Sequence, residues 1–165
     1  MTLIKKIIVF FSLFSIGFLL VYLYKRNQKA PKISFYNEQL FDSSQNKIDQ
    51  NNFKGKPLIV TFYASWCGDC LKELKELNSV KQSDLALIPV ICITDETFDK
   101  LTSFEQKKKY PFLFCKTKKT FNELSIHSIP VTYLINAKGE VVYEHVGALK
   151  WKDKSFLQYA KNLLR

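Results

Sequence analysis

Residues 57–70 decide the fold, and they read Pro57-Leu-Ile-Val-Thr-Phe-Tyr-Ala-Ser-Trp-Cys-Gly-Asp-Cys70. The apolar run 57–64 is typical of a strand that is covered on both faces. Cys67 and Cys70 follow at the point where this strand turns into a helix. The unpaired N–H groups and the dipole at a helix start favour an anion, and here they favour the thiolate of the first cysteine. The stretch therefore predicts a redox-active dithiol.

Two other chemistries use the same cysteine spacing. A zinc site would need further ligands nearby, and neither His127 nor His145 stands at ligand spacing from the pair. A purely structural disulfide is the second alternative. The context favours the redox interpretation, because a strand precedes the pair, an amphipathic helix follows it, and an Ile129-Pro130 pair stands before a later strand.

The distribution of charge bears on possible partners. The net charge of the 165-residue chain is +10. Residues 1–32 carry six basic residues and no acid, which leaves 19 basic and 15 acidic residues, or +4, for the rest. More than half of the excess therefore flanks an N-terminal apolar segment, as in a membrane anchor. No nucleic-acid-binding motif accompanies the remaining lysines, so we expect no nucleic-acid partner.

The apolar segment covers residues 7–24, which carry no charge and are rich in Phe, Leu and Ile. This length is just sufficient to cross a bilayer core as a helix, and Tyr22 and Tyr24 lie at one end, where aromatic rings favour the interface. The alternative is a cleaved signal peptide, but no cleavage pattern and no lipid-carrying cysteine follow Tyr24. We therefore predict a single-pass anchor and tether over 1–29 and a folded domain over 30–165.

Strand and helix patterns alternate along the domain. Strands are predicted at 57–64, 85–94, 130–135 and 140–146, and helices at 70–81, 95–110 and 155–164. Further features are a hairpin-like segment over 34–55, a short helix at best over 121–126, a hairpin turn over 136–139, and buried strand positions for Cys92 and Cys115. The order β-α-β-α-β-β-α predicts an α/β sheet with helices on both sides.

Four stretches together resemble a known family, namely Gly55–Pro57, Phe62–Cys70, Ile129–Ile135 and Gly139–Val142. From about residue 30 onward the chain resembles the thioredoxin superfamily, specifically the membrane-tethered thiol–disulfide oxidoreductases of the TlpA and ResA type. This resemblance implies a thioredoxin-like fold, with a central mixed β-sheet flanked by helices, an extra N-terminal β element, and a cis peptide bond between Ile129 and Pro130.

Each cysteine has an expected role. Cys67, at the helix start, is predicted to attack a partner disulfide, and Cys70, one turn further, to resolve the mixed disulfide. Gly68 and Asp69 between them, and Thr61 in the preceding strand, are expected to tune the pair. Asp69 replaces the proline usual in the family, and Thr61 stands where cytoplasmic thioredoxins place a buried aspartate. The negative charge of Asp69 disfavours a thiolate, which favours a reducing couple.

Glu73 is a candidate proton shuttle. At 100° per residue it falls between Leu77 and Val80, on the flank of the apolar stripe, so we expect a half-buried carboxyl with a raised pKa. The resemblance also implies a functional glutamate at this position. The alternative is a surface glutamate paired with Lys72 or Lys75.

Three residues are candidates for substrate binding. Trp66 is expected to cover the dithiol and offer an apolar contact surface, with core packing as the alternative. A cis Pro130 opposite the dithiol lacks an N–H and would present the backbone of Ile129 to an extended substrate. His127 is expected on the surface rather than in the site.

The sequence thus predicts a membrane-tethered thiol–disulfide oxidoreductase that reduces disulfides of partner proteins, supplied by a membrane or soluble thiol electron donor, without a cofactor or a metal. A thiol peroxidase and a non-catalytic binding or chaperone module with a vestigial dithiol are the alternatives. The resemblance implies an extracytoplasmic domain. Local charge opposes this, because two lysines precede the apolar segment and four basic residues follow it, which favours a cytoplasmic domain.

Overall fold

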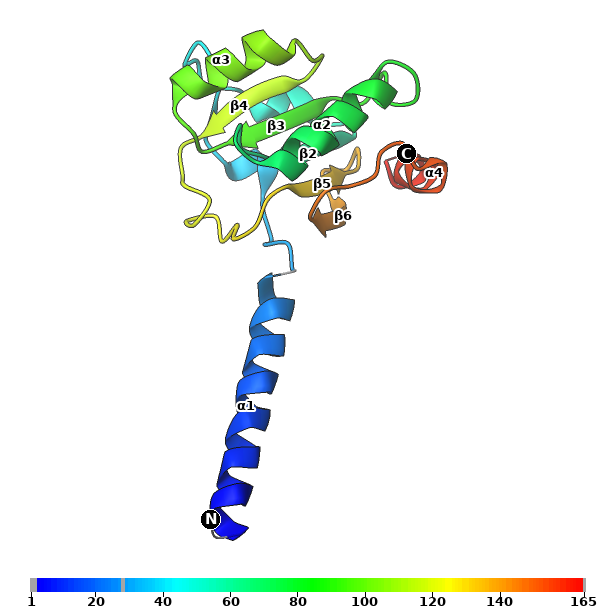
Figure 1. Ribbon diagram of the computed structural model, residues 1–165. Coiled ribbons are helices and arrows are strands. Elements are labelled where there is room, and N and C mark those ends of the chain that lie inside the picture. Colours follow the sequence, from blue (N-terminus) through cyan, green and yellow to red (C-terminus); the bar gives the residue numbers. More distant parts are fainter. Residues whose placement is uncertain (1–2, 28, 165) are drawn as a thin grey trace.

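The computed structural model describes residues 3–27 and 29–164 (Figure 1). Helix α1, Leu3–Asn27, stands apart from the sheet, and its large apolar side chains from Ile7 to Tyr22 are exposed. The expected transmembrane helix is not supported: within the described residues, no helix combines the length and the apolar character that crossing a membrane requires.

A six-stranded sheet in the order β1-β4-β3-β2-β5-β6 forms the domain. The strands are β1 (Leu40–Phe41), β2 (Leu58–Phe62), β3 (Val90–Thr94), β4 (Leu113–Thr117), β5 (Val131–Ile135) and β6 (Val141–Val146). β2, β3 and β4 are parallel, whereas β1, β5 and β6 run antiparallel to their neighbours. The predicted mixed sheet is therefore confirmed, and β1 is the extra N-terminal strand.

Three α-helices complete the domain, α2 (Gly68–Lys81), α3 (Phe98–Lys108) and α4 (Lys154–Leu163). All three pack against the same face of the sheet, where they contact strand residues that include Ile59, Cys92 and Leu134. The crossovers β2-α2-β3 and β3-α3-β4 advance in the same direction across the sheet. Because such crossovers are right-handed, both helices come to the same face. The expectation of helices on both sides is therefore wrong for the α-helices.

The second face of the sheet is covered by the N-terminal segment of the domain and by the loop before β5. Short 3₁₀ helices at Phe35–Asn37 and Gln50–Phe53 contribute Phe35 and Phe53, and the loop contributes Leu124 and Ile126. The chain enters this face at Pro31, whose carbonyl accepts a hydrogen bond of 2.7 Å from the Tyr133 hydroxyl. The core thus lies on both sides of a sheet whose central strands are buried throughout.

Most predicted elements are confirmed within a few residues. The strand predicted over 85–94 begins only at Val90, because residues 82–87 form turns. Residues 121–125 form a turn rather than a helix. β4 contains the buried strand position expected for Cys115, although the predicted order of elements omitted this strand. Cys92 and Cys115 are both fully buried, as predicted for small apolar residues.

Candidate active site

The dithiol lies where β2 ends and α2 begins. Cys67 and Cys70 form a disulfide, with their Cα atoms 5.2 Å apart. Cys67 is the N-cap of α2, and the backbone N–H of Cys70 donates to its sulfur over 3.1 Å. Cys67 retains 7% of its surface and Cys70 none. Only the first sulfur is therefore placed to meet a partner, and it is also the sulfur that the helix start favours as a thiolate.

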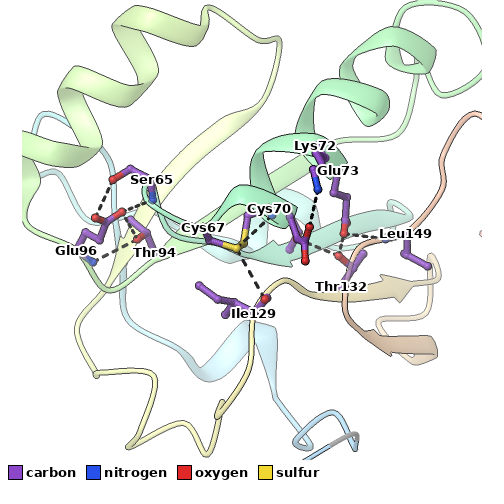
Figure 2. The surroundings of a disulfide bond; sticks show 12 residues. Ser65, Cys67, Cys70, Lys72, Glu73, Thr94, Glu96, Ile129, Thr132 and Leu149 are labelled. Carbon is purple, nitrogen blue, oxygen red and sulfur yellow. Dashed lines mark hydrogen bonds and ion pairs between the residues drawn. A yellow bond between two sulfur atoms is a disulfide. The ribbon is translucent and has the colours of Figure 1, made fainter.

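The loop before β5 faces the first sulfur (Figure 2). The peptide bond between Ile129 and Pro130 is cis, as the family resemblance implied, and the carbonyl oxygen of Ile129 lies 3.8 Å from the Cys67 sulfur. Trp66 is 72% exposed, so the alternative of core packing is wrong and its ring is free to contact a partner. The structure thus brings Trp66, Cys67 and Ile129 together at one surface.

Gly68 and Asp69 lie on the exposed first turn of α2. The Asp69 carboxylate forms an ion pair of 3.1 Å with Lys72, and both side chains are largely exposed. Solvent and the neighbouring ammonium weaken any effect of this charge on the sulfurs. Lys72 is thus engaged by Asp69 and not by Glu73.

Glu73 is buried, with 1% of its surface exposed, so the alternative of a surface glutamate is wrong. Its carboxylate is held by three donors from distant parts of the chain, as Figure 2 shows in part. They are Thr132 Oγ1 at 2.7 Å, the backbone N–H of Leu149 at 3.0 Å and Trp151 Nε1 at 3.5 Å. The carboxyl is more deeply buried than its flanking position on the helical stripe predicted.

Burial dominates the proton affinity of this carboxyl. Removal from water raises the pKa of Glu73 from its ordinary 4.5 to about 7, although the hydrogen bonds from Thr132, Leu149 and Trp151 act in the opposite direction. A pKa near neutrality lets a carboxyl both hold and release a proton under ordinary conditions.

Thr61 belongs to the same buried network. Its Oγ1 lies 2.9 Å from Oγ1 of Thr132, and both hydroxyls are inaccessible to solvent. The Thr132 hydroxyl therefore links Thr61 in β2 to the Glu73 carboxyl. Sequence reasoning identified Thr61 and Glu73 but missed the link, Thr132, which stands two residues after Pro130.

A second network holds the other side of the dithiol loop. The backbone N–H and the hydroxyl of Ser65 donate to the two carboxylate oxygens of Glu96, at 2.6 and 2.9 Å. Glu96 follows β3, and the ammonium group of Lys100 lies 3.4 Å from its Oε1. No spacing pattern in the sequence indicates Glu96. Because β2 and β3 are parallel neighbours, the residues that follow their carboxyl ends meet at the same end of the sheet.

The two histidines considered as zinc ligands, His127 and His145, are not among the residues of this arrangement. His127 is exposed, as expected. In the part of the chain that the structure describes, no three His, Cys, Asp or Glu side chains gather in a way that could hold a metal ion.

A disulfide at the start of the helix that follows a central strand, opposite a cis-proline loop on a mixed sheet, defines the thioredoxin-like class of folds. Residues 25–161 match the Redoxin family, and the chain belongs to this family. The family assignment confirms the thioredoxin-like fold that the sequence predicted.

Individual relatives carry related names. The chain is 31% identical over 121 residues to the thiol:disulfide interchange protein DsbE of Vibrio cholerae, covering 70% of this chain and 65% of that protein. It is 27% identical over 110 residues to the thiol-disulfide oxidoreductase ResA of Bacillus cereus, covering 64% of each. The chain thus spans slightly less than two thirds of the length of these two relatives.

Among solved structures, a thiol:disulfide interchange protein of the thioredoxin family from Chlorobium tepidum superposes with a TM-score of 0.63. The superposition covers 84% of this chain and 97% of that one, at 21% identity. At this identity the similarity concerns the fold alone.

Proposed function

We propose that this protein is a thiol–disulfide oxidoreductase that exchanges disulfides with partner proteins through Cys67 and Cys70. The observation that carries this function is the asymmetry of the pair, in which Cys67 keeps 7% of its surface exposed at a helix N-terminus and Cys70, three residues on, keeps none. Nucleophilic attack on a protein disulfide needs one accessible thiolate. Release of the partner needs a second thiol that attacks the Cys67 sulfur of the mixed disulfide, and the buried Cys70 thiol can reach no other sulfur.

In the reductive direction, the reduced dithiol reacts in two steps. The Cys67 thiolate attacks one sulfur of the partner disulfide, so that the partner S–S bond breaks, a Cys67–partner disulfide forms, and the leaving partner thiolate takes up a proton. Cys70 then loses its proton and attacks the Cys67 sulfur, which forms the Cys67–Cys70 disulfide and releases the second partner thiol. A thiol electron donor must then reduce this disulfide, which returns two electrons and two protons to the pair.

Glu73 is proposed as the group that accepts the Cys70 proton in the second step. It lies on the same helix, one turn beyond Cys70, and it is shielded from solvent. The raised pKa of its carboxyl matches proton transfer near neutral pH. Thr132 and Thr61 orient this carboxyl through their buried hydrogen bonds.

Partner binding is assigned to the exposed surface around Cys67. The Trp66 ring offers apolar contact area, and an extended partner segment can pair with the backbone beside Ile129, whose carbonyl lies near the sulfur. Gly68 leaves room at the first turn of α2, because a Cβ added there would meet nothing within 4 Å.

We further propose that residues 7–24 attach the protein to a membrane, with the domain on the extracytoplasmic side. Thirteen large apolar side chains between Ile7 and Tyr22 are exposed, and the consecutive ones occupy every side of the helix. A helix that lies on a membrane surface is instead amphipathic.

Fractionation of cells tests the attachment. We expect the chain in the membrane fraction after alkaline carbonate washing, and a variant that begins at residue 29 in the soluble fraction. Protease added to intact spheroplasts should digest the domain. A domain that remains protected would reverse the proposed side, and a full chain in the soluble fraction would refute the attachment.

The experiment for the exchange activity uses three cysteine variants of the full chain. Cys70→Ser should accumulate a mixed disulfide with partner proteins, because the resolving thiol is missing, and this species should disappear on reduction. Cys67→Ser and the double Cys67→Ser/Cys70→Ser variant should form none and should lose disulfide exchange. A binding module with a vestigial dithiol predicts full function of the double variant, which would refute the proposed activity.

A further inference from the structure

A groove of about 370 Å³ lies between α2 and α3, next to the dithiol loop. Leu71 of α2 and Phe104 of α3 supply its apolar surface, and Ser65 lies at the end nearest the dithiol. Neither the disulfide nor Glu73 lines this groove, so its shape is not needed for the proton transfer described above.

The groove has a basic lining. Three lysines, Lys100, Lys107 and Lys108, face a single acid, Asp99, which leaves a net charge of +2. Lys100 is engaged by Glu96, at 3.4 Å. Among the described residues neither Lys107 nor Lys108 forms an ion pair, and the ammonium group of Lys108 lies 5.5 Å from the centre of the Phe104 ring. The lysines are thus available to an anionic ligand.

The groove is connected to the reactive sulfur by a short series of contacts. Lys100 contacts Glu96, and Glu96 accepts two hydrogen bonds from Ser65, which stands two residues before Cys67. Figure 2 shows Ser65 and Glu96 on one side of the disulfide and Glu73 with Thr132 on the other. A partner that extends from Cys67 away from Glu73 would therefore reach the groove.

We propose that this groove binds an acidic segment of the partner protein that flanks the disulfide undergoing exchange. Partner carboxylates would pair with Lys107 and Lys108, and an apolar partner side chain would pack on Leu71 and Phe104. Charge complementarity of this kind raises association rates and selects among partners more than it raises affinity. This inference rests on the proposed exchange function and adds a class of partner to it.

The test compares two peptides of equal length that each contain one internal disulfide. One carries Asp and Glu beside its cysteines, and the other carries Asn and Gln at the same positions. The reduced full chain, in nonionic detergent, should reduce the acidic peptide roughly tenfold faster at low ionic strength. This preference should vanish near 1 M salt, where the screening length is only about 3 Å.

Charge reversal locates the effect. Lys107→Glu/Lys108→Glu should abolish the preference and leave the rate for the neutral peptide within about twofold. The control Lys54→Glu/Lys138→Glu changes the net charge equally. Lys54 precedes β2, and Lys138 follows β5, which is antiparallel to β2. Both lysines therefore lie at the ends of these strands that are far from the dithiol. The control variant should still reduce the acidic peptide faster. If the control variant loses this preference equally, the groove is not the binding site.

Binding without chemistry separates this inference from the exchange function. An acidic peptide with serine in place of its cysteines, labelled with a fluorophore, should bind the wild-type chain more tightly than Lys107→Glu/Lys108→Glu, as measured by anisotropy. If neither disulfide peptide is reduced but this difference remains, the exchange function fails and the groove stands. Equal binding by both proteins, or equal reduction of both peptides by the wild type, overturns the groove.

Discussion

The hydroxyl of Thr132 lies 2.7 Å from Oε1 of Glu73 and joins the two halves of the site by one buried hydrogen bond. Glu73 comes from the helix that begins at the dithiol, and Thr132 comes from the strand that follows the cis-proline loop. The protonation of the carboxyl is therefore linked to the strand that positions Ile129 against Cys67. Thr132 can donate to an ionised Glu73 and still accept from Thr61, which gives every group in the network a partner.

Replacement of Glu73 by glutamine should change how stability depends on pH. The pKa of Glu73 is about 7 in the folded protein and near 4.5 when unfolded, so the folded state binds more protons between these values. Its contribution is fully present below pH 4.5 and is lost as the pH rises through 7, at about 1.4 kcal/mol per pH unit, or roughly 3 kcal/mol in total. Urea unfolding of the oxidised Glu73→Gln variant at pH 4.5, 6 and 8 should lack this loss.

The comparison with the wild type isolates the carboxyl, since glutamine keeps its size and can still accept from Leu149. Relative to the wild type, the variant should gain stability from pH 4.5 to about 7, and the difference should level off above that pH. Parallel curves for the two proteins would mean that Glu73 ionises equally in the folded and unfolded chains.

Glu73→Gln should also slow the resolution of the mixed disulfide, by about 10²-fold or more, because a positioned general base contributes at least this much. Single-turnover kinetics would measure the step, with a peptide attached to Cys67 and release of the peptide thiol as the signal. The rate of the wild type should rise with pH around 7, and the variant should lose that rise. An unchanged profile would remove Glu73 from the reaction.

Thr132→Val tests the positioning of the carboxyl separately. The hydrogen bond from Thr132 lowers the pKa of Glu73, so its removal should raise that pKa and move the rise in the resolution rate to higher pH. The variant also leaves the buried Thr61 hydroxyl without a hydrogen-bond partner. We expect this to lower the free energy of unfolding, measured with denaturant, by about 1–3 kcal/mol. A loss of stability with no movement of the pH profile would make Thr132 a packing residue only.

Trp66→Ala should weaken partner binding and leave the fold intact. The side chain is 72% exposed, so its removal should change the free energy of unfolding by less than about 0.5 kcal/mol. For a protein disulfide we expect KM to rise roughly tenfold, since a contact aromatic contributes more than about 1 kcal/mol. The rate with a small aromatic disulfide reagent provides the control, and an equal loss there would mean that Trp66 acts on the sulfurs themselves.

The reduction potential of the Cys67–Cys70 pair reports the direction of exchange. Equilibration of the full chain with glutathione or dithiothreitol should give a value near that of thioredoxin, about −270 mV, or lower, if the protein is a reductase. A value near that of the oxidant DsbA, about −120 mV, would make it a disulfide donor instead.

Much of the fold could be predicted because the central strands carry continuous apolar runs and the helices carry clear stripes. β4 was omitted from the predicted order because it becomes polar at Lys116, next to the edge of the sheet, and lies only a few residues after a helix. β1 has only two residues and depends on pairing with β4, which no local pattern shows. The face on which α3 packs follows from strand order, which the sequence does not display.

In the site, the cysteine motif was visible in the sequence because its residues are contiguous. The burial of Glu73 could be predicted only in part. A helical stripe predicts which side of the helix a residue faces, but not how deeply neighbouring elements cover it. Thr132, Leu149 and Trp151 are 59 to 78 residues from Glu73, and Glu96 is 31 residues from Ser65. Contacts at these separations are made by the topology and have no spacing signature.

The bond between the Tyr133 hydroxyl and the Pro31 carbonyl fixes the point at which the chain leaves the domain. Only four peptide units separate Asn27, the last residue of α1, from Pro31, so the Cα atoms of these two residues lie at most about 15 Å apart. If residues 7–24 attach the protein to a membrane, as proposed, this short connection keeps the dithiol close to the membrane surface. Partners would then have to be proteins that come to that surface or are themselves held there.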